Sequence, residues 1–213
     1  MMIKDTIYYV YDPLCSWCYG FSPVIKKLKS LYDEQFDFQV ISGGMQSGER
    51  KQPVSAIRDY LKGAYKNVTE RTGVEFGDKF MAVLEDGNRM LDSIPPSIAL
   101  SIVKDLKPEE ALNFAATIQE AVYFDGFDWN SVEAYIPYLK VYDFDPEDFK
   151  RKFEDPLYKE KTLEDFKLAA NFGVTGFPSV ILKKDDNYYL IAQGFVPFDQ
   201  LHATLEQVLA SPE

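Results

Sequence analysis

Two cysteines, Cys15 and Cys18, are the only ones in this chain, and they stand at the junction of a predicted strand and a predicted helix. Residues 6–11 are β-branched and aromatic, which is typical of a strand, and Asp12-Pro13 ends that run. Apolar residues then recur at helical spacing over 21–31. The two cysteines are separated by two residues, a Cys-X-X-Cys spacing that randomly placed cysteines would take roughly one time in a hundred. The pair is therefore the feature that most constrains the fold and chemistry.

The position of Cys15 favours a reactive thiol. At the start of a helix, unpaired backbone N–H groups and the positive end of the helix dipole favour a thiolate over a thiol. We therefore expect Cys15 to be a nucleophile and Cys18, one helical turn on, to be the resolving thiol. A structural disulfide or an adventitious metal contact is the alternative interpretation, but a four-residue ring contributes only about 2 kcal/mol to stability.

Metal binding is disfavoured by the count of ligands. Besides the two cysteines the chain has a single histidine, His202. These are three soft ligands, whereas a structural zinc site takes four. We predict no metal site and no organic cofactor, and we expect His202 to lie at the surface.

Composition indicates a folded, acidic chain of 213 residues. Hydrophobic residues make up 46% and aromatic residues 15%, enough for a substantial core. The net charge of -11 repels nucleic-acid phosphates and anionic membrane surfaces, so neither is an expected partner. The N-terminal residues 1–6 carry no signal-peptide pattern and no apolar run is long enough to span a bilayer. We expect a cytoplasmic protein.

The order of predicted elements indicates an α/β fold. Strands at 6–11 and 36–41 flank a helix as a parallel βαβ unit, and a hairpin at 179–182 and 188–192 precedes a last helix at 201–209. The middle of the chain is predicted to be helical throughout, with helices near 54–64, 95–106, 108–122, 131–141, 146–153 and 159–172. We predict a discontinuous domain, 1–45 with 173–213, that carries an all-helical insertion, 46–172.

Two segments carry a family resemblance. Asp12-Pro13-Leu14-Cys15-Ser16-Trp17-Cys18 and Gly173-Val174-Thr175-Gly176-Phe177-Pro178-Ser179, with the helical block between them, resemble the DsbA family of thioredoxin-fold proteins. The first segment is most similar to the cytoplasmic FrnE-like branch. The resemblance implies a thioredoxin-like fold, with a central mixed sheet and a large helical insertion.

The same resemblance implies an activity and a substrate site. It predicts a thiol-disulfide oxidoreductase or protein disulfide isomerase that acts on protein or peptide thiols and disulfides, with glutathione as a redox partner. It also implies that Phe177-Pro178 is a cis peptide facing the cysteines, where the Phe177 backbone pairs with an extended substrate. Trp17 is a candidate for substrate contact, with core packing as the alternative. No feature of the sequence indicates an oligomeric state.

Two departures from the family pattern bear on proton transfer and redox potential. Thioredoxin-like proteins often place a buried acid six residues before the first cysteine, where this chain has Tyr9. Asp12 could substitute for that acid, although an aspartate before proline is more often part of a turn. The dipeptide between the cysteines is Ser16-Trp17 rather than the Pro-His of strongly oxidising members, so we expect a less oxidising couple.

Two other functions fit parts of the pattern. In the first, the protein is an adaptor that binds client proteins through the acidic helical insertion. In the second, it is a glutathione-dependent isomerase or transferase of the kappa type. Proteins of that type tend to carry serine at the position of Cys15, and the presence of both cysteines favours the oxidoreductase.

Overall fold

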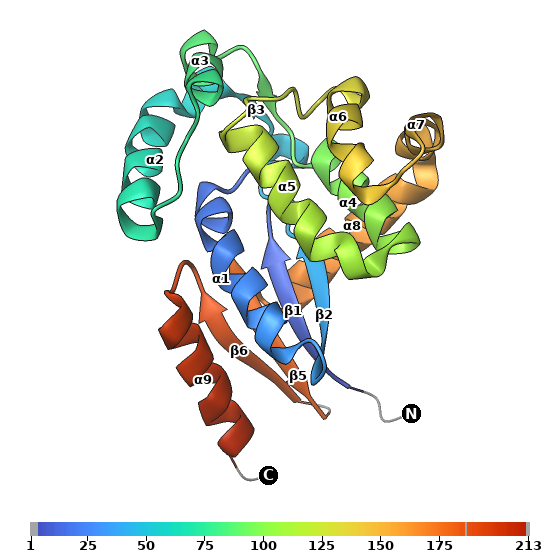
Figure 1. Cartoon of the computed structure of the whole chain (residues 1–213). Helices are drawn as coiled ribbons and strands as arrows, with labels where there is room; N and C mark the ends of the chain where they lie inside the picture. The colour runs from blue at the N-terminus through green and yellow to red at the C-terminus, as the bar shows by residue number, and fades with distance from the viewer. Residues whose placement is uncertain (1–3, 186, 212–213) are drawn as a thin grey trace.

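A four-stranded mixed sheet forms the centre of the computed structural model, which describes residues 4–185 and 187–211 (Figure 1). The strand order is β2-β1-β5-β6, and only the β1-β2 pair is parallel. The strands are β1 (Asp5–Tyr11), β2 (Phe36–Ser42), β5 (Ser179–Lys184) and β6 (Asn187–Gln193). The predicted α/β class with a mixed sheet is therefore confirmed. Residues 1–3 of the predicted leader-free N-terminus and Asp186 in the predicted hairpin turn lie outside the described residues.

Side chains of β1 alternate between two layers of helices. Ile7, Tyr9 and Tyr11 belong to the main hydrophobic cluster with residues of α1 (Ser16–Tyr32) and α9 (Phe198–Ala210). Val10 belongs instead to a smaller cluster with Ala169 of α8 (Pro156–Asn171). This period of two is what a strand buried on both faces requires. In Figure 1, α1 and α9 accordingly lie on the near side of the sheet, with α8 behind it.

The helical block lies between β2 and β5 in sequence. It comprises η1 (Gly48–Arg50), η2 (Val54–Ile57), α2 (Arg58–Thr72), α3 (Asp78–Asp86), α4 (Ile94–Leu106), η3 (Pro108–Glu110), α5 (Ala111–Tyr123), η4 (Val132–Tyr135), α6 (Ile136–Leu139), η5 (Lys140–Tyr142), α7 (Pro146–Glu154) and α8. Proline stands in the first turn of α4, as expected, and of α7 and α8.

Two predictions for this block are wrong. The segment 131–141 is not one helix but three short turns, η4, α6 and η5, and Pro137 falls where a continuous helix would need its N–H. The block is also not helical throughout, because β3 (Gln52–Pro53) pairs with β4 (Met90–Leu91) in a small antiparallel ladder. That two-residue pairing joins segments almost forty residues apart, and no local pattern reveals it.

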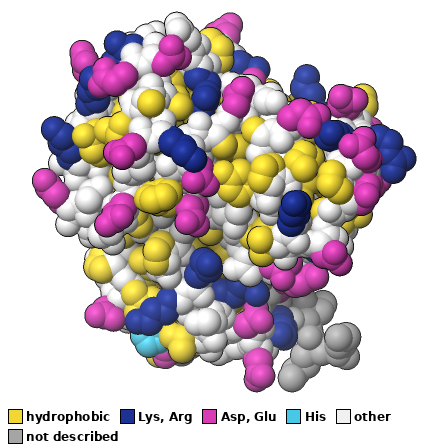
Figure 2. All heavy atoms as spheres, turned by 45° about the horizontal axis from the view of Figure 1, so that its top comes forward, with side chains coloured by type: hydrophobic (Ala, Val, Ile, Leu, Met, Phe, Trp, Pro, Cys, Tyr) yellow, Lys and Arg dark blue, Asp and Glu magenta, His cyan; other side chains and the backbone are white. Residues whose placement is uncertain are grey.

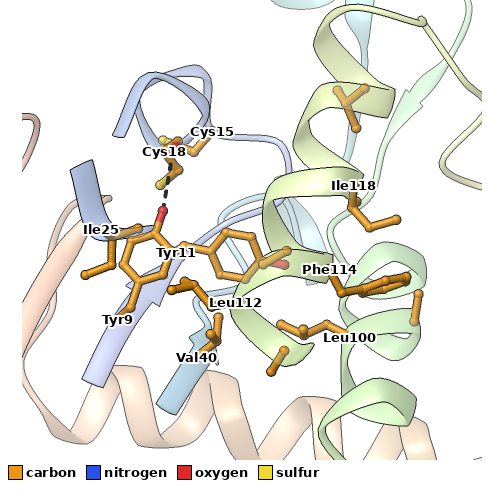
Figure 3. Packing of buried hydrophobic residues seen from close by; sticks show 14 of the residues in the cluster. Tyr9, Tyr11, Cys15, Cys18, Ile25, Val40, Leu100, Leu112, Phe114 and Ile118 are labelled. Atoms are coloured by element: carbon orange, nitrogen blue, oxygen red, sulfur yellow. Dashed lines mark hydrogen bonds between the residues drawn. The ribbon is translucent and has the colours of Figure 1, made fainter. Parts of the chain in front are cut away.

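The helical block and the sheet share one hydrophobic core. The main cluster contains Tyr11 of β1 and Val40 of β2 together with Phe114 and Ile118 of α5 (Figure 3). On the other face, the Asp165 carboxylate of α8 accepts the backbone N–H of Ser42 at 3.1 Å. The division of the chain at residues 45 and 173 into two domains stays a prediction.

Replacing Phe114 by alanine tests this shared core. Phe114 is fully buried, so Phe114→Ala should lower the free energy of unfolding by about 3–5 kcal/mol. Phe124→Ala makes the same change at a side chain that is 45% exposed and should cost less than about 1 kcal/mol. Urea unfolding followed by circular dichroism measures both, and a loss below about 1 kcal/mol for Phe114→Ala would contradict the packing.

Candidate active site

The two cysteines lie where β1 ends and α1 begins. Cys15 is the N-cap of α1 with an extended backbone, and its N–H donates to the Asp12 carbonyl at 3.1 Å. The N–H of Cys18 donates to the Cys15 carbonyl at 3.0 Å, which closes the first helical turn between them. Both thiols are free. Cys15 is 7% exposed and Cys18 is fully buried, so Cys15 is the thiol nearer to solvent.

The segment before β5 lies against Cys15. Strand β5 runs antiparallel to β1 with Ser179 opposite Val10, and this register carries the preceding residues to the end of the sheet from which α1 starts. The Cys15 Sγ donates to the Phe177 carbonyl oxygen at 3.7 Å, and the Phe177-Pro178 peptide bond is cis. The structure thus brings Cys15, Phe177 and Pro178 together from segments far apart in the sequence.

A glycine makes room for the Phe177 ring. Gly43 follows β2, and a Cβ atom at this position would collide with the Phe177 side chain. The structure puts Gly43 directly against Phe177, so the close approach of a ring to backbone accounts for the glycine.

Cys18 lies above the hydroxyl of Tyr9. The Tyr9 Oη donates to the Cys18 carbonyl oxygen at 3.5 Å (Figure 3). Burial raises the pKa of Tyr9 well above its ordinary value, and the neighbouring Cys18 adds to the rise. Burial also raises the pKa of the Cys18 thiol, with a further contribution from its hydrogen bond to Cys15. At neutral pH both Tyr9 and Cys18 therefore keep their protons.

Asp12 is both a turn residue and a buried carboxylate. Its Oδ1 accepts the Leu14 N–H at 2.9 Å, the local bond of an Asx turn, and the Ser93 hydroxyl at 3.0 Å. Its Oδ2 accepts the Met45 N–H at 2.6 Å. Asp12 is fully buried, and burial raises the pKa of its carboxyl to about 6 against the lowering effect of these three bonds.

Gln119 is a site residue that the sequence interpretation missed. Its amide lies 2.8 Å from the Ser22 hydroxyl and against the backbone of Cys15 and Cys18, so α5 contacts the first turns of α1 through a buried polar group. A signal for it existed. Gln119 is a polar residue four positions after Ala115, on the helix that carries a buried apolar stripe.

Two other residues singled out from sequence lie in different places. Trp17 is half-buried, and its ring centroid lies 6.1 Å from that of Phe195 in the loop after β6. His202, on α9, is partly exposed and bonds the Tyr32 hydroxyl at 2.8 Å. Trp17 therefore lies at the site, whereas His202 pairs with a residue at the C-terminal end of α1.

The face of the molecule shown in Figure 2 is mixed in character. On the face shown in Figure 2, hydrophobic side chains gather near the middle, with acidic and basic side chains interspersed around them.

Within residues 4–185 and 187–211, no group of three or more His, Cys, Asp or Glu side chains is arranged to hold a metal ion. In that same part of the chain, no helix is both long and apolar enough to cross a membrane.

The geometry of the site agrees with the family to which the sequence matches. This geometry combines a strand, a cysteine pair at a helix start and a facing Phe177-Pro178 segment. A sequence family described as thioredoxin matches residues 8–201. The chain belongs to this thioredoxin family. Solved structures extend the match over the whole fold. A candidate protein disulfide isomerase from Nitrosomonas europaea is 26% identical, with a TM-score of 0.85 over 97% of this chain and 98% of that one.

Other relatives of this chain are described either as a disulfide reductase or as an adapter protein. The cytosolic disulfide reductase DsbM from Pseudomonas aeruginosa is 27% identical, with a TM-score of 0.76 over 96% of this chain and 98% of that one. The ClpXP adapter protein SpxH from Halalkalibacterium halodurans is 23% identical over 95% of this chain and 67% of its own length. The match to SpxH from Bacillus subtilis, 24% identical over 82% of this chain, spans 56% of that relative's length.

Replacing Asp12 by asparagine tests the buried carboxyl. A pKa raised in the folded protein contributes stability at acidic pH that is lost as pH rises through about 6. An asparagine side chain does not titrate, so the stability of Asp12→Asn relative to the unaltered protein should improve by about 1 kcal/mol between about pH 5 and about pH 7.5. Urea unfolding of the reduced proteins at both pH values measures the difference.

The matched control is Asp199→Asn, which removes a carboxylate from the exposed first turn of α9. This variant should keep the pH dependence of the unaltered protein. If Asp12→Asn also kept it, the carboxyl of Asp12 would not titrate near pH 6 in the folded state.

Proposed function

We propose that the protein is a thiol-disulfide oxidoreductase in which Cys15 is the nucleophile and Cys18 the resolving thiol. One observation carries the proposal: the Sγ of Cys15, at the N-cap of α1, lies 3.7 Å from the Phe177 carbonyl oxygen with a second free thiol one turn behind it. The matches to a cytosolic disulfide reductase and a candidate disulfide isomerase support this class of reaction.

The proposed reaction has two exchange steps. The Cys15 thiolate attacks one sulfur of a substrate disulfide, a mixed disulfide forms, and the other substrate sulfur leaves as a thiolate. Cys18 then gives its proton to the substrate thiolate released in the first step and attacks the Cys15 sulfur, which releases the second substrate thiolate and leaves a Cys15-Cys18 disulfide. The substrate gains two electrons and the cysteine pair loses two. The reverse sequence oxidises a dithiol substrate.

We propose the cytoplasm as the location, reduction as the working direction, and glutathione as a partner that restores the dithiol. The Ser16-Trp17 dipeptide supports a less oxidising couple, because no imidazole lies between the cysteines to stabilise a thiolate. DsbM is described as cytosolic and as a reductase, and one of its structures contains GSH. The Cys-Ser-Trp-Cys motif supports a place in the FrnE-like branch of DsbA relatives.

The substrate surface in this proposal combines backbone and aromatic groups. The Phe177 backbone next to Pro178 would pair with an extended protein or peptide segment, and Trp17 would contact its side chains. Trp17 is half-buried, so one part of the ring packs on the protein while the other remains available.

Single serine variants separate the two cysteine roles. Cys15→Ser should lower the rate of insulin reduction by about 10²-fold or more, because the attacking sulfur is gone. Cys18→Ser should keep the attack but fail to release its product, so a mixed disulfide with substrate accumulates and is visible by mass spectrometry. Accumulation with Cys15→Ser instead would reverse the assignment.

The direction of the reaction follows from the reduction potential. Equilibration of the cysteine pair with glutathione buffers should place it closer to about -270 mV, the thioredoxin value, than to about -120 mV, that of a strong oxidant. A potential near about -120 mV would contradict reduction as the working direction and would indicate a cytoplasmic thiol oxidase.

An adaptor function is the second candidate, and the match to SpxH over 95% of the chain is the observation that favours it. An adaptor presents another protein without needing thiol chemistry. The variant with both Cys15→Ser and Cys18→Ser should therefore lose its cellular function if the protein is an oxidoreductase. Complementation of a deletion strain by this double variant would replace the oxidoreductase proposal with the adaptor.

A further inference from the structure

We propose that Arg71, which lies within cation–π distance of Trp17 and Phe195, forms a subsite for a carboxylate of the disulfide substrate. The inference rests on the proposed oxidoreductase function and specifies its substrate: a disulfide that carries an anionic group close to the reacting sulfur. Glutathione, a short thiol peptide with free carboxylates, and an acidic peptide segment are the two sources of this chemistry.

The aromatic part of the subsite is built from both sides of the active site. Trp17 lies between the two cysteines in the first turn of α1, and its ring centroid is 6.1 Å from that of Phe195. Phe195 directly follows Gly194, whose N–H donates to the Pro178 carbonyl oxygen at 2.7 Å. The two rings are therefore fixed to the cysteine turn and to the Pro178 segment respectively.

Arg71 reaches these rings from the last turn of α2. Its guanidinium carbon lies 5.3 Å from the centroid of the Trp17 ring and 5.8 Å from that of Phe195. The end of α2 is held close to α1 because Gly20 has no side chain there. A Cβ at Gly20 would lie 2.7 Å from the Thr72 methyl group. The packing of Thr72, the next residue in the chain, against Gly20 thus positions Arg71.

The guanidinium of Arg71 has unused hydrogen-bonding capacity. A cation–π contact uses none of the guanidinium N–H groups as hydrogen-bond donors to oxygen, so they can still bind a carboxylate, and such a pair can be bidentate. Arg71 is exposed, and among the described residues no carboxylate oxygen lies within 4.0 Å of it and no hydrogen-bond acceptor pairs with it. Arg89 and Arg151, by contrast, are both ion-paired with aspartates.

The positive charge of Arg71 can promote the binding of an anionic substrate to a protein that is acidic as a whole. With a net charge of -11, the chain repels an anionic substrate at long range. A local cation over the Trp17 ring, which belongs to the cysteine turn, offsets this repulsion near the site. Contact with the two rings also limits the motion of the Arg71 side chain, so less entropy is lost when a carboxylate binds.

The test compares Arg71→Gln with Arg151→Gln, which removes the same charge from an exposed position on α7. Stopped-flow kinetics measure the rate constant for oxidation of each reduced protein by glutathione disulfide, by glutathione disulfide with its carboxylates esterified, and by the uncharged bis(2-hydroxyethyl) disulfide. Arg71→Gln should slow the reaction with glutathione disulfide about 5- to 10-fold and leave the other two within about 2-fold. Arg151→Gln should change none of the three by more than about 2-fold.

Peptide disulfides separate the two sources of the carboxylate. Two otherwise identical peptides carry either glutamate or glutamine next to the disulfide. A loss with Arg71→Gln confined to the glutamate peptide assigns the subsite to acidic clients, whereas a loss confined to glutathione disulfide assigns it to glutathione; either supports the carboxylate subsite.

The inference can fail while the proposed function stands. Equal slowing of charged and uncharged disulfides by Arg71→Gln, or no slowing of any, would overturn the carboxylate subsite. Cys15→Ser, measured with the uncharged disulfide in the same experiment, reports the proposed function independently, because that substrate does not engage Arg71.

Discussion

The antiparallel pairing of β1 with β5 is the interaction on which the site depends. It sets Val10, the penultimate residue of β1, opposite Ser179, the first residue of β5, so the end of one strand and the start of the other share one end of the sheet. Cys15 follows the first strand and Phe177 precedes the second, which is why their atoms meet at 3.7 Å. A shift of this register by one residue would exchange the two faces of β5 and separate the groups.

The second constraint is a polar layer buried beneath the cysteines. Asp12 holds the turn after β1, the Met45 segment after β2 and the Ser93 hydroxyl at the start of α4. Gln119 adds α5 to the same layer. Burying a carboxylate is costly unless its oxygens are hydrogen-bonded, and here both oxygens are. The helical block is therefore fixed to the cysteine turn by directed bonds as well as by apolar packing.

The local parts of this architecture could be predicted from sequence, and the convergent parts could not. Residues 6–11 and the apolar spacing of α1 indicate a strand and a helix, and two cysteines at their junction indicate thiol chemistry. Arg71 and Ser93 have no such pattern, because their importance comes from packing between segments far apart in the chain. Pro178 became a site candidate only through family resemblance. Helix α3 was not singled out within the block, although Phe80, Val83 and Leu84 recur at helical spacing and Gly87 ends the helix.

The environments of the two thiols make the proposed exchange asymmetric. Cys18 is fully buried, and its pKa is raised first by that burial, then by Cys15, and further by the charge of Asp12. Tyr9 also keeps its proton, because burial raises its pKa, and so the phenol cannot accept the proton of Cys18 at neutral pH. Cys15 lies at the helix start and is the more exposed of the two thiols, at 7%. In the proposed exchange, attack begins at Cys15, and the substrate thiolate that leaves in the first step takes the proton of Cys18.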